Sequence, residues 1–238
     1  MSVFHFKRFD VRNDTSAMKV GTDSVLLGTC ALLPLSVERA LDVGTGTGVV
    51  ALMLAQRLGV NFLHIQGIDI DPASVQEARY NFASSPWAER LSVCQCSLHD
   101  WPIRKNAYDL IVSNPPFYDD SLKNPDERQS LARHTISLSY RDICAYASGS
   151  LSNGGVLAMV LPSDVERQLV RTAVSFDLYP KQITYIRTTS RKPIKRIVAN
   201  FTKSTLRPQC DTSEVVMMQD GKFTAQYLSM VEPFLNIK

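Results

Sequence analysis

From residue 39 onward, short apolar runs alternate along the chain with amphipathic stretches. Each run is short and bounded by polar or turn-forming residues, which predicts a buried strand. The predicted strands are Ala40–Val43, Leu63–Asp69, Leu91–Cys96, Tyr108–Val112 and Val156–Leu161. Helical spacing of apolar residues predicts a helix over Gly48–Leu58, and Pro72 directly after Asp71 is typical of a capped helix start, here for Pro72–Ser84. Strands that alternate with helices predict an α/β fold with a doubly wound, mostly parallel sheet.

Two further strands are predicted over Gln182–Arg187 and Ile194–Phe201. They are close enough in sequence to pair antiparallel at one edge of the sheet. Asp220-Gly221 is a turn signal later in the chain.

Two segments do not follow this alternation. Residues 1–38 form an N-terminal extension, in which Phe4, Phe6 and Phe9 suggest a short strand and Ser24–Leu33 a helix. Residues 118–138 are polar, and a connection of this length is usually functional or disordered, so we interpret it as a mobile lid or a substrate loop. The length of 238 residues fits a single domain, with 39–238 as its core.

Composition narrows the class of protein. The chain is 45% hydrophobic and 21% charged, which is ordinary for a globular domain. No apolar stretch approaches the roughly 18 residues of a membrane span, and the early charges argue against a secretory signal. The five cysteines include no CxxC pair, so we expect reduced thiols and no metal site. Together these features predict a cytoplasmic protein that does not bind membranes, and a monomer is expected.

The charge distribution suggests a partner. Eight of the 26 basic residues and no acidic residue lie between Lys181 and Arg207, which leaves 18 basic against 23 acidic residues elsewhere. A positive segment on an acidic body is typical of a protein that binds a polyanion. A solvated surface strip is an equally good interpretation of the charge alone.

A glycine-rich turn follows the first predicted strand of the core, in the sequence Asp42-Val43-Gly44-Thr45-Gly46-Thr47-Gly48. Glycines at a strand-to-helix turn allow the backbone to approach a ligand closely. The GxGxG spacing differs from the GxGxxG of a dinucleotide-binding turn, and Asp42 adds a carboxylate suited to an amino group, which a dinucleotide lacks. Asp69, at the end of the next strand, can accept hydrogen bonds from both hydroxyls of a ribose, and Asp71 is expected to cap the following helix.

A second motif, Asn114-Pro115-Pro116-Phe117, follows the strand Tyr108–Val112. An exocyclic amino group on a purine is a poor nucleophile, because its lone pair is shared with the ring. The Asn114 side-chain oxygen and the Pro115 carbonyl can hold its two hydrogens and favour a tetrahedral nitrogen, so that positioning drives the transfer. Phe117 offers a flat face for stacking of a planar target.

With these residues in view, the chain resembles class I S-adenosylmethionine-dependent methyltransferases that carry an Asn-Pro-Pro-Tyr/Phe motif. More narrowly, it is similar to the bacterial tRNA(Val) (adenine-N6)-methyltransferase family. Three stretches carry this narrower resemblance besides the glycine turn: Lys19–Asp23, Gly67–Asp71 and Ser113–Tyr118. The resemblance covers nearly the whole chain. It implies a Rossmann-like methyltransferase fold, S-adenosylmethionine as cofactor, and an adenine next to the anticodon of a tRNA as target.

The resemblance also implies roles for residues that spacing alone does not assign. Lys19, Gly21, Thr22 and Asp23 would close over the cofactor, while Asn114 and Phe117 would serve the adenine. Ser97 and Leu98 would contact the cofactor's adenine, although an acidic residue is commoner where Ser97 stands. The residues expected to contact the RNA are Pro116, Tyr118, Arg133, Arg191, Lys192, Lys195 and Arg196.

The Asn-Pro-Pro-Phe motif leaves the target open, because related enzymes methylate guanine N2 in ribosomal RNA, adenine in DNA, or a protein glutamine. Enzymes of these three other types usually carry an additional recognition domain or insertion, and none is evident in this sequence. A non-catalytic nucleotide-binding protein would be expected to have lost Asn114 or the glycine turn. An NAD-dependent oxidoreductase would need GxGxxG.

Overall fold

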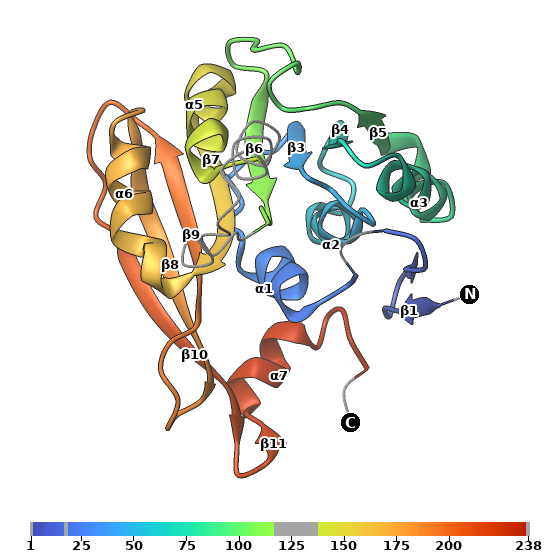
Figure 1. Ribbon diagram of the computed structural model, residues 1–238, viewed down its shortest axis with the longest axis vertical. Helices are drawn as coiled ribbons and strands as arrows, with labels where there is room; N and C mark the ends of the chain where they lie inside the picture. Colours follow the sequence, from blue (N-terminus) through green and yellow to red (C-terminus); the bar gives the residue numbers. More distant parts are fainter. Residues whose placement is uncertain (1, 17–18, 117–137, 237–238) are drawn as a thin grey trace, which may run out of the picture.

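The computed structural model describes residues 2–16, 19–116 and 138–236. Its main feature is a nine-stranded sheet of order β11-β10-β8-β9-β7-β6-β3-β4-β5 (Figure 1). The central strands β3 (Arg39–Val43), β4 (His64–Asp69), β5 (Leu91–Gln95), β6 (Tyr108–Ser113) and β7 (Leu151–Pro162) are parallel to one another. All five were predicted from their apolar runs. β7 begins five residues earlier than expected.

The pairing of the two later strands is confirmed. β9 (Arg196–Lys203) lies between β7 and β8 (Leu178–Thr189) and is antiparallel to both. Two strands that were not predicted extend the sheet beyond β8. β10 (Asp211–Gln219) runs parallel to β8, and β11 (Lys222–Phe223) pairs with it across the predicted Asp220-Gly221 turn.

The side chains of the sheet alternate between two apolar layers, as strand geometry requires. Ala40 belongs to the layer formed with α1 (Thr22–Cys30), α2 (Val49–Leu58), α3 (Pro72–Ala83) and α7 (Ala225–Val231). Leu41 belongs to the layer formed with α5 (Tyr140–Ser150) and α6 (Glu166–Val174). The fold is therefore the doubly wound α/β sheet that the alternation predicted, with helices on both faces (Figure 1).

The N-terminal extension is part of the first layer. β1 (Val3–His5) and β2 (Asp10–Arg12) form a hairpin, and Phe6 and Phe9 stack in its turn with ring centroids 4.4 Å apart. The predicted helix is present as α1, which begins two residues and ends three residues earlier than expected. Its contact with α2 depends on Gly28, because a Cβ there would lie 2.5 Å from the Met53 sulfur. Among the described residues, no helix is long and apolar enough to cross a membrane.

Candidate active site at the carboxyl edge of the sheet

Four neighbouring parallel strands end at one edge of the sheet, and the predicted site residues follow them. In the strand register, Val43 of β3 pairs with both Ile68 of β4 and Ser113 of β6. The glycine turn, Asp69 and Asn114 directly follow or end these three strands. Ligands of open α/β sheets bind outside the carboxyl ends of the strands. The structure thus brings together residues from separate parts of the sequence at the place where this fold binds its ligands.

The glycine turn has a backbone that requires glycine. Gly44, Gly46 and Gly48 have φ angles of 69°, 54° and 82°, in the left-handed region that other residues rarely adopt. Gly48 is also the N-terminal cap of α2, and a Cβ there would lie 2.4 Å from the Phe82 ring. The turn is held to the next strand because the Gly44 and Thr45 amides donate to the Ile68 carbonyl, at 2.9 and 3.0 Å. The sequence GxGxG therefore specifies one closely packed conformation.

Two carboxylates flank this turn in different environments. Asp42 is only 1% exposed, and its Oδ2 accepts a 2.7 Å hydrogen bond from the Thr45 hydroxyl. Burial raises the pKa of Asp42 to about 7. Thr45 was not among the predicted site residues, although it stands inside the motif.

Asp69 is partly exposed, and its two oxygens accept amide hydrogens from Gly46 (2.9 Å) and Asp71 (3.0 Å). Each carboxylate oxygen can accept a second hydrogen bond, so Asp69 can still receive ribose hydroxyls. Asp71 caps α3 as expected, and its side chain accepts from the Ala73 and Ser74 amides.

The end of β5 lies beside Asp69, because the Cys96 amide donates to the Asp69 carbonyl at 2.9 Å. Ser97 follows directly, and its hydroxyl accepts from the His99 amide at 3.2 Å. Leu98 is buried in the layer of α5 and α6. The predicted adenine contacts therefore stand next to the predicted ribose contact, and their roles stay predictions.

Asn114 is the most informative residue of the site. It is 9% exposed, and its side-chain oxygen is buried without a hydrogen-bond partner among the described residues. The preceding residue is fixed, because the Ser113 hydroxyl donates to the Val43 carbonyl at 2.8 Å. An unsatisfied buried acceptor costs about 1–3 kcal/mol, so the Asn114 oxygen is placed to accept a hydrogen bond from a ligand, since no residue in the described part of the chain donates to it. Pro115 is buried and Pro116 exposed, whereas Phe117, Tyr118 and Arg133 lie outside the described residues.

The N-terminal residues expected at the cofactor have other contacts in the structure. The Lys19 ammonium donates to the carbonyls of Asn13 (2.9 Å) and Asp14 (2.5 Å). Gly21 precedes α1, and Thr22 begins it. Asp23, in its first turn, forms a 2.9 Å ion pair with Arg196 of β9. A residue expected to bind cofactor and one expected to bind RNA thus bind each other. Contacts of these residues with the cofactor stay predictions.

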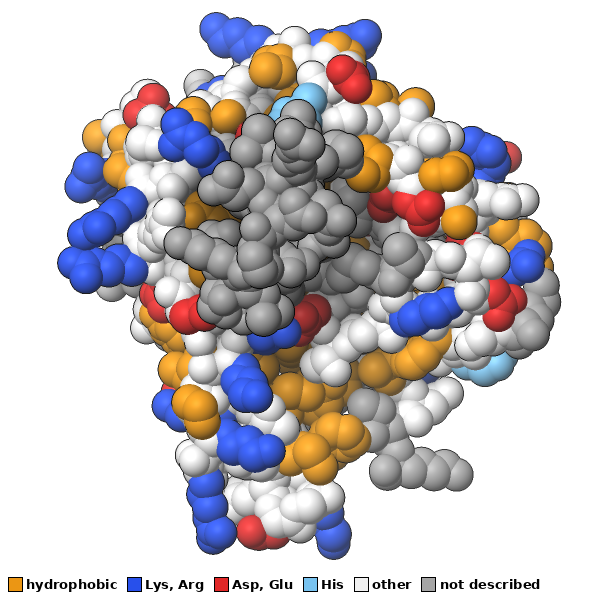
Figure 2. All heavy atoms as spheres, viewed as in Figure 1, with side chains coloured by type: hydrophobic (Ala, Val, Ile, Leu, Met, Phe, Trp, Pro, Cys, Tyr) orange, Lys and Arg blue, Asp and Glu red, His pale blue; other side chains and the backbone are white. Residues whose placement is uncertain are grey.

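The basic segment is divided between the two ends of the sheet. Arg191, Lys192 and Lys195 are exposed in the turn between β8 and β9, at the same edge as Asn114. Lys203 donates to the Leu151 carbonyl at the opposite end, about 23 Å away along β9. Of the eight basic residues, those of the β8–β9 turn are therefore the ones placed to meet a ligand of the site. In Figure 2, Lys and Arg side chains are scattered over one face, at its margin and below its centre, rather than gathered in a single block.

No cluster of three or more potential metal ligands occurs in the described part of the chain.

The fold and the site define a Rossmann-like methyltransferase. A family model described as a methyltransferase domain matches residues 40–135. The structure is similar to a predicted O-methyltransferase from Agrobacterium tumefaciens, with a TM-score of 0.69, 16% identity, and coverage of 89% of this chain and 96% of that one. It is also similar to geranyl diphosphate C-methyltransferase from Streptomyces coelicolor, with a TM-score of 0.53, 14% identity and coverage of 75% of each chain. At these identities the likeness concerns the fold.

Curated relatives are much closer in sequence. The tRNA1(Val) (adenine(37)-N6)-methyltransferase of Flavobacterium johnsoniae is 37% identical over 234 residues, which cover 98% of each chain. The protein of the same name from Parabacteroides distasonis is 38% identical and covers 97% of this chain and 96% of its own. This chain therefore belongs to the tRNA1(Val) (adenine(37)-N6)-methyltransferase family, which confirms the resemblance inferred from the motifs.

Proposed function

We propose that this protein transfers a methyl group from S-adenosylmethionine to N6 of adenine 37 of tRNA1(Val). The observation that carries the proposal is the buried Asn114 oxygen beside the glycine turn, which no described residue hydrogen-bonds. Family membership supports the choice of tRNA and of adenine N6.

The residues present fit S-adenosylmethionine. The glycine turn leaves no Cβ over its backbone, Asp42 provides negative charge beneath it, and Asp69 can accept ribose hydroxyls. When bound, the cofactor supplies a methyl group made electrophilic by its sulfonium. These features favour a nucleoside with a cationic amino acid arm over a dinucleotide, whose pyrophosphate would meet the negative charge of Asp42.

The chemistry assigned to the protein is positioning. The Asn114 oxygen and the Pro115 carbonyl accept the two hydrogens of the adenine amino group, which turns its lone pair out of conjugation with the ring. The nitrogen becomes acidic only as its new bond forms, so no strong base is needed, and the acceptors already hold the proton that leaves. Such positioning is worth several orders of magnitude in rate. The adenine must leave its stack to reach a buried acceptor.

The test is methyl transfer from radiolabelled S-adenosylmethionine to total tRNA from a strain that lacks the protein, followed by nucleoside analysis. We expect label in N6-methyladenosine, and none in a tRNA1(Val) transcript with guanine at position 37. Label in N2-methylguanosine would keep the mechanism and change the target. Absence of label in any tRNA, with cofactor binding intact, would contradict the proposal and direct the search to ribosomal RNA or protein glutamine.

The RNA is proposed to meet the exposed cations of the β8–β9 turn. Charge reversal of all three (Arg191→Glu, Lys192→Glu, Lys195→Glu) is expected to weaken tRNA binding at least about tenfold at low salt. The salt dependence of log K is expected to decrease by about 0.7–0.9 for each phosphate that the variant no longer binds. Filter binding over a salt series measures both. Arg196 is left intact, because its ion pair with Asp23 makes its loss ambiguous.

A matched control reverses three exposed cations at the opposite edge of the sheet, Arg104, Lys105 and Arg207. This control has the same net charge and is expected to retain most of the affinity. Equal losses in both triple variants would mean that net charge alone acts, and that the turn is not an RNA contact.

That the chain is a single domain that acts as a cytoplasmic monomer stays a prediction from its length and composition.

A further inference from the structure

One face of α3 carries a row of polar side chains in the protein interior. Ser74, Glu77 and Asn81 follow helical spacing, and each is at most 3% exposed. Buried polar groups, and carboxylates above all, are rare unless other groups bind them. This polar face of α3 therefore has a binding role, and the mechanism proposed above does not use it.

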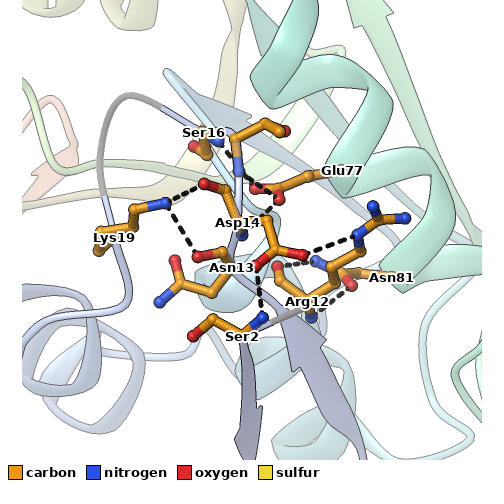
Figure 3. A network of polar contacts seen from close by, with 9 residues as sticks. Ser2, Arg12, Asn13, Asp14, Ser16, Lys19, Glu77 and Asn81 are labelled. Atoms are coloured by element: carbon orange, nitrogen blue, oxygen red, sulfur yellow. Dashed lines mark hydrogen bonds and ion pairs between the residues drawn. The ribbon is translucent and has the colours of Figure 1, made fainter.

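The polar face binds the backbone of the segment Arg12–Ser16, which we call the strap. One oxygen of Glu77 accepts the amides of Asp14 (2.5 Å) and Thr15 (2.7 Å), and the other accepts the amide of Ser16 (3.0 Å; Figure 3). Asn81 exchanges two hydrogen bonds with the backbone of Arg12, at 2.8 and 3.0 Å. One carboxylate thus accepts the hydrogen bonds of three successive amides, which in a sheet would go to the carbonyls of a neighbouring strand.

The strap ends beside the glycine turn. Ser16 is 2% exposed, and its hydroxyl lies 2.9 Å from that of Ser74. The same hydroxyl would lie 3.9 Å from a Cβ at Gly46. Asn81 also donates to the Thr47 carbonyl at 2.8 Å, so the polar face of α3 holds the strap and the turn together.

Glu77 is well suited to this task as an anion. Burial by itself raises the pKa of its carboxyl, but the hydrogen bonds from Thr15, Ser16 and Asp14 together outweigh burial and hold the pKa below its usual range. Hydrogen bonds to an ionised acceptor are about twice as strong as neutral ones.

We propose that Glu77 is a positioning residue for cofactor binding: it fixes the strap against Gly46, and the strap holds the glycine turn in its binding conformation. The inference rests on the proposed function only in taking S-adenosylmethionine as the cofactor. Glu77 touches neither the cofactor nor the target base. Its effect is therefore confined to affinity for the cofactor and does not extend to the transfer step.

The test compares Glu77→Ala, Glu77→Gln and wild type by calorimetric titration with S-adenosylmethionine and by steady-state kinetics. Glu77→Ala is expected to raise the Kd and the KM for the cofactor about tenfold or more, with kcat at saturating cofactor within about twofold of wild type. Glutamine retains an oxygen that accepts two of the three amides, so Glu77→Gln is expected to recover most of the affinity. If Glu77→Ala does not fold, Glu77→Asp takes its place, because its shorter side chain cannot reach all three amides. A Kd for Glu77→Asp equal to that of wild type would then overturn the proposal.

Asn200 provides the matched control. Asn200 is buried and binds the C-terminal end of the N-terminal extension. Its side chain accepts a hydrogen bond from the Leu32 amide (2.7 Å) and donates one to the Cys30 carbonyl (3.3 Å). Asn200→Ala is expected to lower Tm by several degrees with cofactor affinity unchanged. If Asn200→Ala weakens cofactor binding as much as Glu77→Ala does, or if Glu77→Ala leaves the Kd unchanged, the proposal is overturned. Absence of cofactor binding by wild type would instead refute the proposed function.

Discussion

Replacing Asn114 by alanine is expected to lower the rate of methyl transfer by at least about 100-fold while cofactor affinity stays nearly unchanged. In the proposed mechanism the Asn114 oxygen is one of two acceptors for the reacting amino group, and a misplaced reactant costs about this factor. The measurements are single-turnover transfer to tRNA1(Val) and calorimetric titration with S-adenosylmethionine. Loss of cofactor affinity as the main effect would contradict the assignment, since it would place Asn114 in the cofactor site alone.

The same variant has an informative effect on stability. The Asn114 oxygen is buried without a partner among the described residues, so its removal relieves a desolvation penalty. We expect the ligand-free Asn114→Ala protein to melt at or above the wild-type temperature. Asn200→Ala makes the contrast, because it removes a buried amide that has partners. An Asn114→Ala protein that is as stable as wild type but much slower in methyl transfer would show that Asn114 serves the reaction and not the stability of the fold.

Cofactor affinity is expected to fall about 50-fold between pH 7 and pH 5. Asp42 is buried, and its pKa in the folded, cofactor-free protein is raised to about 7 from an ordinary value of 3.8. The cofactor's ammonium, which we expect at the turn, would stabilise the ionised carboxylate through the low-dielectric interior. Below pH 7 a proton must leave Asp42 before the cofactor binds, so the apparent Kd rises about fivefold from pH 7 to pH 6 and about tenfold from pH 6 to pH 5. Titration calorimetry at several pH values between 5 and 7 measures this slope.

Stability of the cofactor-free protein is expected to change in the opposite direction. Between pH 4 and 7 the folded state binds a proton at Asp42 that the unfolded chain has released, so the free energy of unfolding decreases as pH rises through this range. Asp42→Asn removes the titrating group and is expected to bind cofactor weakly, with a flat pH profile. A wild-type slope that survives in Asp42→Asn would belong to another group and would contradict the assignment.

The parts of the fold that could be predicted from the sequence are those where burial leaves a pattern. β3 and β6 are buried along most of their length, and their apolar runs end within a residue of the predicted limit. β10 was not predicted, because its first four residues are exposed and Val215 is its one buried residue. A strand near the edge of a sheet needs little apolar surface and so carries little signal.

The site shows the same division. Gly44, Asp69 and Asn114 could be predicted because each stands at the end of a predicted strand, and parallel strands end at one edge. Glu77 could not, because its partners lie 61 to 63 positions earlier in the chain. The division of the basic segment was also hidden, since it depends on the antiparallel pairing of β8 and β9, which separates the charges in the middle of the segment from those near its two ends.

The contacts of the N-terminal extension have a consequence for folding during synthesis. The amide of Lys7 donates to the Phe234 carbonyl, and the Lys7 side chain pairs with Glu232, 225 positions later. Sequence separation of this size slows folding, because a large loop must close before the contact forms. The extension is therefore synthesised before the core, but its contacts with Glu232 and Phe234 can form only after α7 has been synthesised. We expect the strands and helices of the core to form on the nascent chain before the extension has docked, so that the extension is the last part of the molecule to dock.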